Sequence, residues 1–254
     1  MDGRRRGGVG TSGNLIHTLL HPMVSGKRTR ERVVFLLDVD NTLLDNDRII
    51  ADLRAALTRE VGAEKEARYW SIFETCRAEL GYADYLGALQ RIRLEDSHDQ
   101  NLLAISSMLV NYPFQERLYP GALDVIRHFD QWGTTVILTD GDVVFQPLKI
   151  ERSGLAAAVG GRVLIYVHKE HELADVERRF PADHYVLVDD KVRILSAVKA
   201  AWGSRVTTVF PKQGHYATDP GVAGYPTPDF SVERIGDLLA QSPPPGVDNV
   251  RSEI

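Results

Sequence analysis

Short runs of apolar residues alternate with stretches of helical periodicity over most of the chain. Five short runs, apolar or mostly so, are present at residues 33–37, 135–138, 163–166, 185–188 and 206–210, with threonine in the second and fifth. Continuous runs of this length are typical of strands that are buried on both faces of a parallel sheet. Helical patterns lie between and after them, at residues 123–129, 146–153, 171–180, 192–202 and 232–239. The alternation predicts an α/β fold with a doubly wound parallel sheet.

A long helical segment separates the first apolar run from the second. From about residue 48 to residue 113 apolar residues recur at helical spacing, which indicates about four helices and no strand. The pattern divides the chain into a core made of residues 31–47 and 114–241 and an inserted helical domain at 48–113. Residues 1–30 and 242–254 are interpreted as flexible tails.

Two carboxylates follow the first apolar run. Asp38 and Asp40 lie where that strand is expected to end, and side chains alternate along an extended chain, so both point to the same side. Ligands of open α/β sheets bind at the carboxyl ends of the strands. The pair is therefore either a small acidic site or an Asx-type turn beside a solvated Asp38.

The second apolar run ends in residues suited to an anion. Thr139 offers a hydroxyl, Gly141 allows close approach of the backbone, and the N–H groups from Asp140 onward are expected to be free. This combination predicts a phosphate-binding turn.

The third and fourth runs end in charged residues. Lys169 stands just past residues 163–166, at the start of a predicted helix whose N-terminus favours anions. Asp189 and Asp190 follow residues 185–188 directly. Adjacent carboxylates at the end of a buried strand repel one another, so this pair indicates a bound cation.

These four strand ends resemble the motifs of the haloacid dehalogenase superfamily. They occur in the family's order, as DVDNT, VILTDG, HKE and VLVDD, over about residues 32 to 210. The resemblance implies a Rossmann-like core, and the helical insert at 48–113 stands where the family carries its first type of cap. We therefore expect an α/β fold in which an all-helical cap domain is inserted into the doubly wound sheet.

The resemblance also implies a role for each motif residue. Asp38 would be the nucleophile that forms an aspartyl-phosphate, and Asp40 would be the general acid and base. Mg²⁺ would be the cofactor, because it prefers oxygen ligands. Its ligands would be Asp38, Asp189, the backbone carbonyl of Asp40 and, as an outer or further ligand, Asp190. The phosphoryl group would be held by Thr139, Asp140, Gly141 and Lys169.

The second aspartate indicates which reaction the site catalyses. Haloacid dehalogenases lack the acid/base aspartate and need no metal, so Asp40 and the acidic pair favour a Mg²⁺-dependent phosphomonoester hydrolase. Its substrate would be a small phosphorylated metabolite. Phosphotransferase or mutase activity is left open. The alternative to an enzyme is a binding or regulatory protein that has this fold but does not catalyse a reaction. The motifs do not identify the leaving alcohol.

Composition restricts the partners of the protein. The chain has 254 residues and a net charge of -5, which argues against extensive contact with nucleic acid. It contains no apolar stretch of membrane-spanning length and one cysteine, so we expect a cytoplasmic protein of undetermined oligomeric state. A Gly-x-Gly-x-x-Gly pattern at residues 8–13 follows no strand and does not predict a dinucleotide site.

Other candidate residues are interpreted as structural. His168 and His171 flank Lys169 without further ligands at zinc spacing, so they are taken as surface or packing residues. The stretch 210–216 is interpreted as a surface loop in preference to an edge of the active site. In the helical segment, aromatic residues are taken as core and arginines as solvated faces. The residues concerned are Trp70, Arg77, Tyr82, Arg91 and Arg93.

Overall fold

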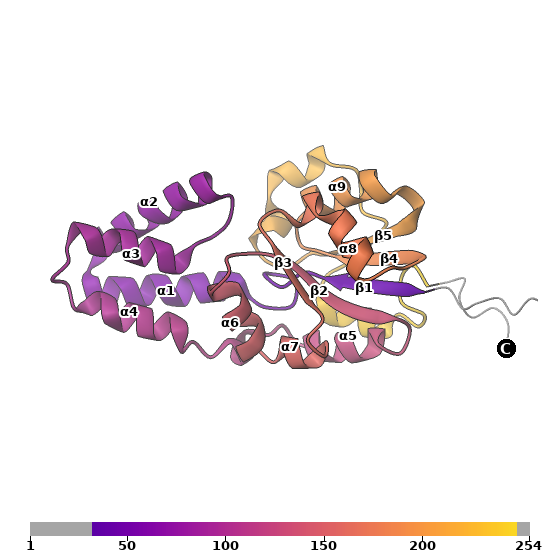
Figure 1. Ribbon diagram of the computed structural model, residues 1–254, viewed down its shortest axis with the longest axis horizontal. Helices are drawn as coiled ribbons and strands as arrows, with labels where there is room; N and C mark the ends of the chain where they lie inside the picture. The colour runs from indigo at the N-terminus through magenta and orange to yellow at the C-terminus, as the bar shows by residue number, and fades with distance from the viewer. Residues whose placement is uncertain (1–31, 248–254) are drawn as a thin grey trace, which may run out of the picture. The chain divides into compact units, whose positions relative to one another are not determined.

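A single parallel sheet forms the centre of the α/β core in a computed structural model, which describes residues 32–247. Its six strands lie in the order β3-β2-β1-β4-β5-β6 (Figure 1). The bounds are Val33–Leu37 (β1), Thr134–Asp140 (β2), Val163–Tyr166 (β3), His184–Val188 (β4), Val206–Pro211 (β5) and Phe230–Val232 (β6). The prediction of a doubly wound, Rossmann-like sheet is confirmed, and each of the five apolar runs forms a strand.

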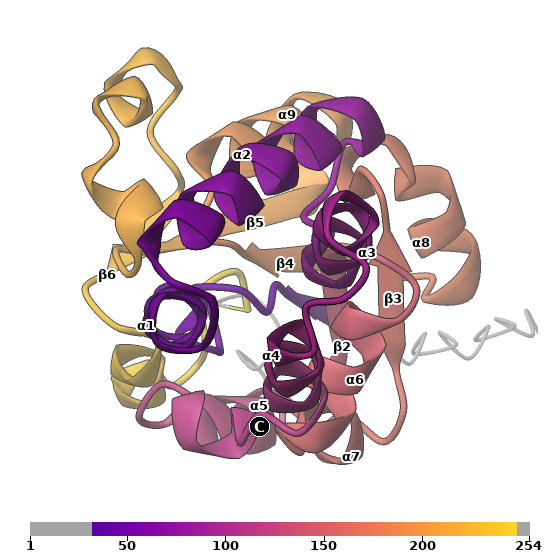
Figure 2. The same ribbon diagram turned by 90° about the vertical axis from the view of Figure 1, so that its left-hand side faces the viewer.

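Helices cover both faces of the sheet. Along β1, Val33, Phe35 and Leu37 belong to one apolar cluster and Val34 and Leu36 to another, so the strand is buried on both sides. Figure 2 shows one group of helices on each side. The first group is α5 (Ala122–Phe129), α6 (Phe145–Arg152) and α7 (Leu155–Ala158), and the second is α8 (Leu173–Arg179) and α9 (Val192–Trp202). Burial on both faces explains why β1 appears in the sequence as an unbroken apolar run.

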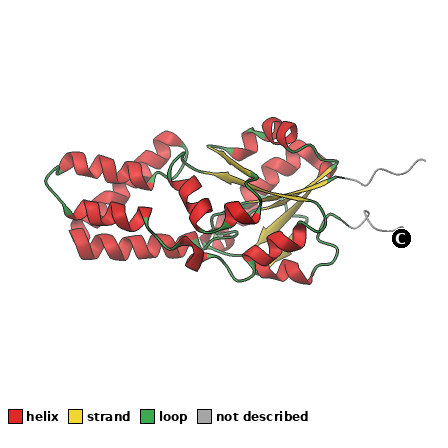
Figure 3. Cartoon of the chain, turned by 60° about the horizontal axis from the view of Figure 1, so that its bottom comes forward, coloured by secondary structure: helices red, strands yellow, loops and turns green. Residues whose placement is uncertain are grey.

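Four helices follow β1 in the chain. They form the all-helical group on the left of Figure 1 and Figure 3, apart from the strands. They are α1 (Asn46–Val61), α2 (Ala63–Leu80), α3 (Tyr85–Glu95) and α4 (Asn101–Val110). The Asp45 side chain accepts a hydrogen bond from the N–H of Arg48 and so begins α1. Gly81, with a φ of +83°, ends α2 in the left-handed conformation. Tyr85 packs on the buried ring of Phe73 with 4.8 Å between ring centroids.

The end of the core differs from the helix predicted at residues 232–239. Phe230–Val232 forms the edge strand β6 beside β5, and Ile235–Ala240 is a 3₁₀ helix. Ile235 and Leu238 are buried three residues apart, a spacing that a 3₁₀ helix presents on one side as readily as an α-helix does. A strand of three residues is too short to show a period of its own.

The packed chain also extends beyond the C-terminal boundary that the sequence predicted. Val247 is buried in the apolar cluster on the β1 face, so residues 242–247 are not the flexible tail expected from their proline content. The predicted tail at 1–30, the glycine pattern at 8–13 and residues 248–254 lie outside the described residues. Among residues 32–247, no helix combines the length and the apolar character needed to cross a membrane.

Candidate active site

The register of the sheet brings the first and fourth motifs together. Leu37 pairs with Val188, so the next residues, Asp38 and Asp189, leave adjacent strands at the same edge. The N–H of Asp38 donates to the Val188 carbonyl at 3.0 Å, which continues the ladder by one residue. Thr42 adds a second link: its hydroxyl donates to Asp38 Oδ2 at 3.3 Å and accepts the N–H of Asp190 at 3.0 Å. The threonine of the first motif therefore holds the two acidic segments together.

Lys169 lies between the two buried carboxylates. Its ammonium nitrogen is 2.5 Å from Asp38 Oδ1 and 2.6 Å from Asp189 Oδ2, and its side chain is 1% exposed. Asp140 Oδ1 accepts the backbone N–H of Lys169 at 2.8 Å. The third motif is thus fixed to the end of β2, and the lysine compensates two charges that would otherwise be buried together.

Burial and neighbouring charges shift the carboxyl groups in different directions. Burial alone would raise the pKa of Asp38, but the charges of Lys169 and Lys191 outweigh it and hold that pKa below its ordinary value. Burial and the negative charge of Asp38 raise the pKa of Asp189 to about 6, although Lys169 opposes the shift. Burial, Asp38 and Asp189 raise the pKa of Asp190 well above its ordinary range. Asp38 is therefore held in its ionised form, whereas burial beside other carboxylates favours the protonated forms of Asp189 and Asp190.

The acidic pair and Asp38 have the composition of a divalent-metal site. One oxygen from each of Asp38, Asp189 and Asp190 can be chosen so that all lie within 4.8 Å of one another, and all three residues are buried. Both oxygens of Asp190 lack a hydrogen-bond partner. Buried carboxylate oxygens without donors are costly, and a hard cation such as Mg²⁺ binds oxygens of this kind. The three side chains could hold such an ion.

Asp40 is held by a lysine that the sequence reasoning missed. Lys149 in α6 donates to both Asp40 oxygens, at 2.7 and 2.9 Å, and to Asn46 Oδ1 at 3.1 Å. Lys149 is 1% exposed, because it occupies the same helix face as the buried Phe145 and Ile150. A lysine on an otherwise apolar helix face is the signal that could have identified it. Asp40 is therefore ion-paired with a buried lysine of α6, which a simple turn would not require.

The predicted phosphate-binding turn after β2 is only partly open. The N–H of Gly141 donates to the carbonyl of Tyr166 at 2.9 Å, so it is not the free donor that was predicted. The Thr139 hydroxyl accepts a hydrogen bond from Gln146 at 3.1 Å and is buried. Parallel pairing with β3 takes up the Gly141 group, a cross-strand contact that the sequence of one strand cannot show. Asp140 and Gly141 nevertheless line the cavity beside the acidic cluster.

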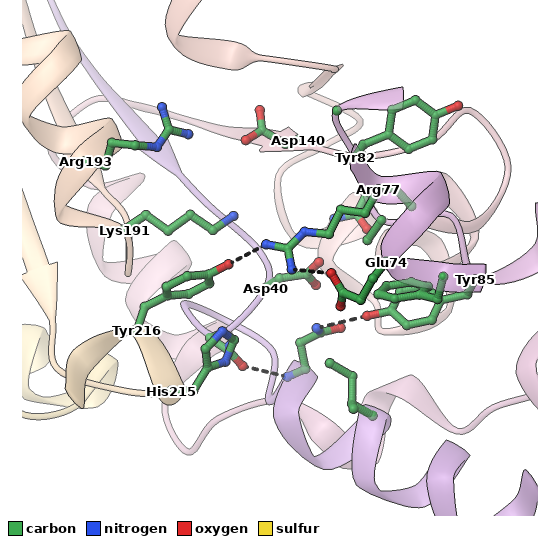
Figure 4. Close-up of a pocket in the computed structure, with 18 of the residues that line it drawn as sticks. Asp40, Glu74, Arg77, Tyr82, Tyr85, Asp140, Lys191, Arg193, His215 and Tyr216 are labelled. Atoms are coloured by element: carbon green, nitrogen blue, oxygen red, sulfur yellow. Dashed lines mark hydrogen bonds and ion pairs between the residues drawn. The ribbon is translucent and has the colours of Figure 1, made fainter. Parts of the chain in front are cut away.

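A cavity of about 610 Å³ lies between the ends of the strands and the helices α1–α3. Figure 4 shows that Asp40, Asp140 and Lys191 reach it from the core, whereas Arg77 and Tyr82 reach it from the helical segment. The two parts of the chain therefore share one cavity, with the proposed acid/base at its wall.

The stretch 210–216 borders this cavity and is not a plain surface loop. Gln213 donates to the Thr42 carbonyl at 3.0 Å, and its Oε1 accepts the N–H of Ile235 at 2.6 Å. Gly214 has a φ of +66° and lies so close to Asn41 that an added Cβ would be 2.6 Å from the Asn41 side chain. These contacts place His215 and Tyr216 in the cavity wall. They are long-range contacts, and the local sequence carries no sign of them.

Arg77 is exposed, as its interpretation as a solvated arginine predicts, but it also contacts the core. Its Nη2 donates to the Tyr216 hydroxyl at 3.1 Å, which joins α2 to the loop after β5 across the cavity. Arg91 and Arg93 are exposed, as expected, and Trp70 is buried. His168 packs against Gly81, where an added Cβ would lie 2.8 Å from its Nε2. Helical periodicity distinguishes inside from outside, but it cannot show that an outer face meets a second part of the chain.

The core and the four strand-end motifs define a hydrolase of the haloacid dehalogenase type. Residues 33–202 match the family model of the haloacid dehalogenase-like hydrolases, and the chain belongs to that family. No curated protein matches the sequence.

Solved structures share the fold. One described as a haloacid dehalogenase-like hydrolase from Burkholderia xenovorans LB400 is 62% identical, with a TM-score of 0.80, and the match covers 84% of this chain and 97% of that one. YfnB from Bacillus subtilis, a HAD-hydrolase bound to magnesium, is 17% identical over 84% of this chain and 98% of its own, with a TM-score of 0.56. The L-2-haloacid dehalogenase from Xanthobacter autotrophicus is 16% identical over 82% and 96%, with a TM-score of 0.53. The last two similarities concern the fold alone.

Proposed function

We propose that the protein is a Mg²⁺-dependent phosphomonoester hydrolase that acts on small phosphorylated metabolites through an aspartyl-phosphate on Asp38. The observation that carries this proposal is the buried group of Asp38, Asp189 and Asp190, in which both Asp190 oxygens lack partners. Three carboxylates buried at one place are costly unless a cation binds between them. A phosphate ester adds further negative charge, so its approach to Asp38 requires positive charge both from a protein side chain, Lys169, and from the metal ion.

The residues of the chain divide the chemistry between them. Asp38, kept ionised by Lys169, attacks phosphorus, and the ester bond to the leaving oxygen breaks. Asp40 gives a proton to that oxygen and then takes one from the water that hydrolyses the acyl phosphate. Lys169 stays within contact of Asp38 and balances charge on the phosphoryl oxygens. Mg²⁺ bound by Asp38, Asp189 and Asp190 would supply Lewis-acid charge stabilisation.

We also propose that the four helices act as a cap over the site. Arg77 and Gly81 of α2 contact Tyr216 and His168 of the core, respectively, so the helical segment closes one side of the cavity. A closed cap excludes water and strengthens charge interactions inside. The domain limits 48–113 for the cap and 31–47 with 114–241 for the core are part of this proposal.

Asp40 is the reason for preferring phosphate-ester hydrolysis to dehalogenation. A dehalogenase releases a halide ion, which needs no proton, so a general acid at this position has no role there. Here Asp40 lies at the cavity wall, held by Lys149, where a leaving oxygen would need protonation. The site thus contains a general acid, Asp40, which an alcohol leaving group requires and a halide does not.

Removal of metal tests the proposal directly. We expect the purified protein to hydrolyse p-nitrophenyl phosphate or a member of a phosphomonoester panel with added Mg²⁺, and to lose that activity in excess EDTA. Restoring Mg²⁺ should restore the rate, which excludes irreversible unfolding by the chelator. Absence of metal-dependent turnover with every ester of a broad panel would contradict the proposal and favour a binding or regulatory protein with this fold.

Lys149→Met is expected to lower kcat by about tenfold to a hundredfold, which is part of the roughly 10²–10⁴-fold that general acid–base catalysis contributes. The substitution removes both hydrogen bonds that orient Asp40, while the methionine keeps most of the side-chain volume. Steady-state kinetics should show the loss in kcat and a smaller change in KM, because Lys149 acts through Asp40 and not on the phosphoryl group. Lys199→Met is the control, since Lys199 pairs with Asp229 far along the sheet from Asp40. Unchanged kcat in Lys149→Met would show that Asp40 needs no such support.

A further inference from the structure

Two cations in the cavity make no direct ion pair with the acidic residues of the proposed phosphoryl chemistry. Arg77 belongs to α2, and Lys191 follows the acidic pair directly; both line the cavity. Figure 4 shows their charged ends directed toward each other beside Tyr216. Arg77 Nη2 is 3.1 Å from the Tyr216 hydroxyl, and the Lys191 ammonium group is 5.4 Å from the centre of the Tyr216 ring. Both positive charges therefore adjoin the same aromatic residue.

Carboxylates lie less close to Arg77 and Lys191 than to the buried lysines Lys169 and Lys149. Lys169 and Lys149 make close ion pairs with the acidic residues of the site. Arg77 is 3.7 Å from Glu74 Oε2, beyond a good hydrogen bond. Within residues 32–247 no carboxylate is close enough to the Lys191 ammonium group to form an ion pair. Two like charges that face one cavity, one with a single ion pair at 3.7 Å and the other with none, favour the binding of an anion there.

The two cations approach the cavity from different sides, Lys191 from beside the acidic cluster and Arg77 from the helical segment. Lys191 interacts electrostatically with Asp38 and Asp190, whereas Arg77 enters from the helical segment and is joined to Tyr216. Arg77 thus lies at the part of the cavity that the leaving group would occupy once the phosphoryl group is at Asp38. An arginine presents a planar set of donors that matches a carboxylate or a phosphate.

We propose that the substrate is a phosphate ester whose alcohol carries a second anionic group, a carboxylate or another phosphate, which binds between Arg77 and Lys191. This inference rests on the proposed function and adds the substrate class to it. Trp70 and Phe73 also line the cavity, so contacts to carbon atoms of the substrate are available beside the charged group.

Matched ester pairs test the inference. 3-Phosphoglycerate and glycerol 3-phosphate differ mainly by a carboxylate in place of a hydroxymethyl group. Fructose 1,6-bisphosphate and fructose 6-phosphate differ by one phosphate. We expect kcat/KM with Mg²⁺ to be at least about tenfold higher for the doubly anionic member of one of the pairs, since hydrogen bonds to charged groups are among the stronger ones. Which pair shows the preference distinguishes a carboxylate from a second phosphate.

Substitution of the arginine should remove the preference. In Arg77→Met the ratio of kcat/KM between the two members of the preferred pair is expected to fall by about tenfold, whatever happens to the absolute rates. Arg68→Met is the matched control on the same helix, because Arg68 pairs with Glu95 outside the cavity and should leave the ratio unchanged. Tyr216→Phe distinguishes the charge of Arg77 from closure of the helical segment. Loss of its hydroxyl contact to Arg77 should lower kcat/KM for both esters by the same factor and leave their ratio unchanged.

The outcomes distinguish this inference from the function on which it rests. Mg²⁺-dependent hydrolysis with equal efficiency for both members of each pair would contradict the inference and leave the phosphatase assignment intact. A charge preference that survives in Arg77→Met would also contradict it. Failure of every ester to turn over with Mg²⁺ would contradict the proposed function, and the inference with it.

Discussion

Asp38→Asn is expected to lower phosphomonoester hydrolysis by about a thousandfold or more, as removal of a covalent nucleophile does in other enzymes. The amide is nearly isosteric with the carboxylate, so the position at the end of β1 and the contact with Thr42 can be kept. What is lost is the negative charge that faces Lys169 and the oxygen that attacks phosphorus. Steady-state rates with and without Mg²⁺ measure the effect.

A matched substitution controls for nonspecific damage. Asp124→Asn changes an exposed carboxylate in α5 and should leave the rate within about twofold, because surface changes of this kind have small effects. Circular dichroism should show the same secondary structure in both variants and the parent protein. Substantial remaining turnover in a folded Asp38→Asn protein would mean that another group attacks the substrate.

Asp190→Asn is expected to stabilise the metal-free protein while it weakens metal binding. Neither oxygen of Asp190 has a hydrogen-bond partner, and Asp38 and Asp189 are charged neighbours. Replacing an unpaired buried charge with a neutral amide should raise the free energy of unfolding by roughly 1–3 kcal/mol. That corresponds to an increase in Tm of several degrees for a protein of this size. In contrast, Mg²⁺ should raise the Tm of the parent protein more than that of the variant.

The pH dependence of stability has a sign that follows from the same carboxylates. The pKa of Asp189 is raised from 3.8 to about 6 in the folded state, and that of Asp190 is raised further. The folded state therefore binds these protons more tightly than the unfolded chain does, and the metal-free protein should become more stable as the pH falls from about 7 to about 5. Thermal unfolding in EDTA measures this, and the gain should be smaller in Asp190→Asn. If Asp190→Asn is less stable than the parent protein in EDTA, the interpretation of Asp190 as an unpaired carboxylate of a metal site is wrong.

Local patterns were sufficient to predict the centre of the fold. The short, mostly apolar runs identify β1, β2, β3, β4 and β5, and the runs in the central strands β1 and β4 contain no polar residue because these strands are buried on both faces. Helix α9 occupies Val192–Trp202, the predicted range, since its apolar face is regular and Gly203 follows it. The 3₁₀ helix at Ile235–Ala240 was predicted as an α-helix because the two helix types share a three-residue apolar spacing.

The candidate site was predictable only as far as each residue lies at the end of its own strand. Asp38, Lys169 and Asp189 meet because the register of neighbouring parallel strands brings their carboxyl ends to one edge. Lys149 and Arg77 could not be assigned in the same way. Each projects from a helix toward a different part of the chain, and that placement depends on how helices pack against the sheet and against one another.

Trapping of the covalent intermediate is the most direct test of the central claim. A substrate mixed briefly with the Mg²⁺-loaded protein and quenched in acid should leave one phosphoryl group on the peptide that contains Asp38. Reduction of the acyl phosphate with borohydride should then convert residue 38 to homoserine, which mass spectrometry identifies. Detection of this product at Asp38, and its absence in Asp38→Asn, is the result that phosphoryl transfer to the first motif predicts. Turnover with no phosphoryl group on Asp38 would contradict it.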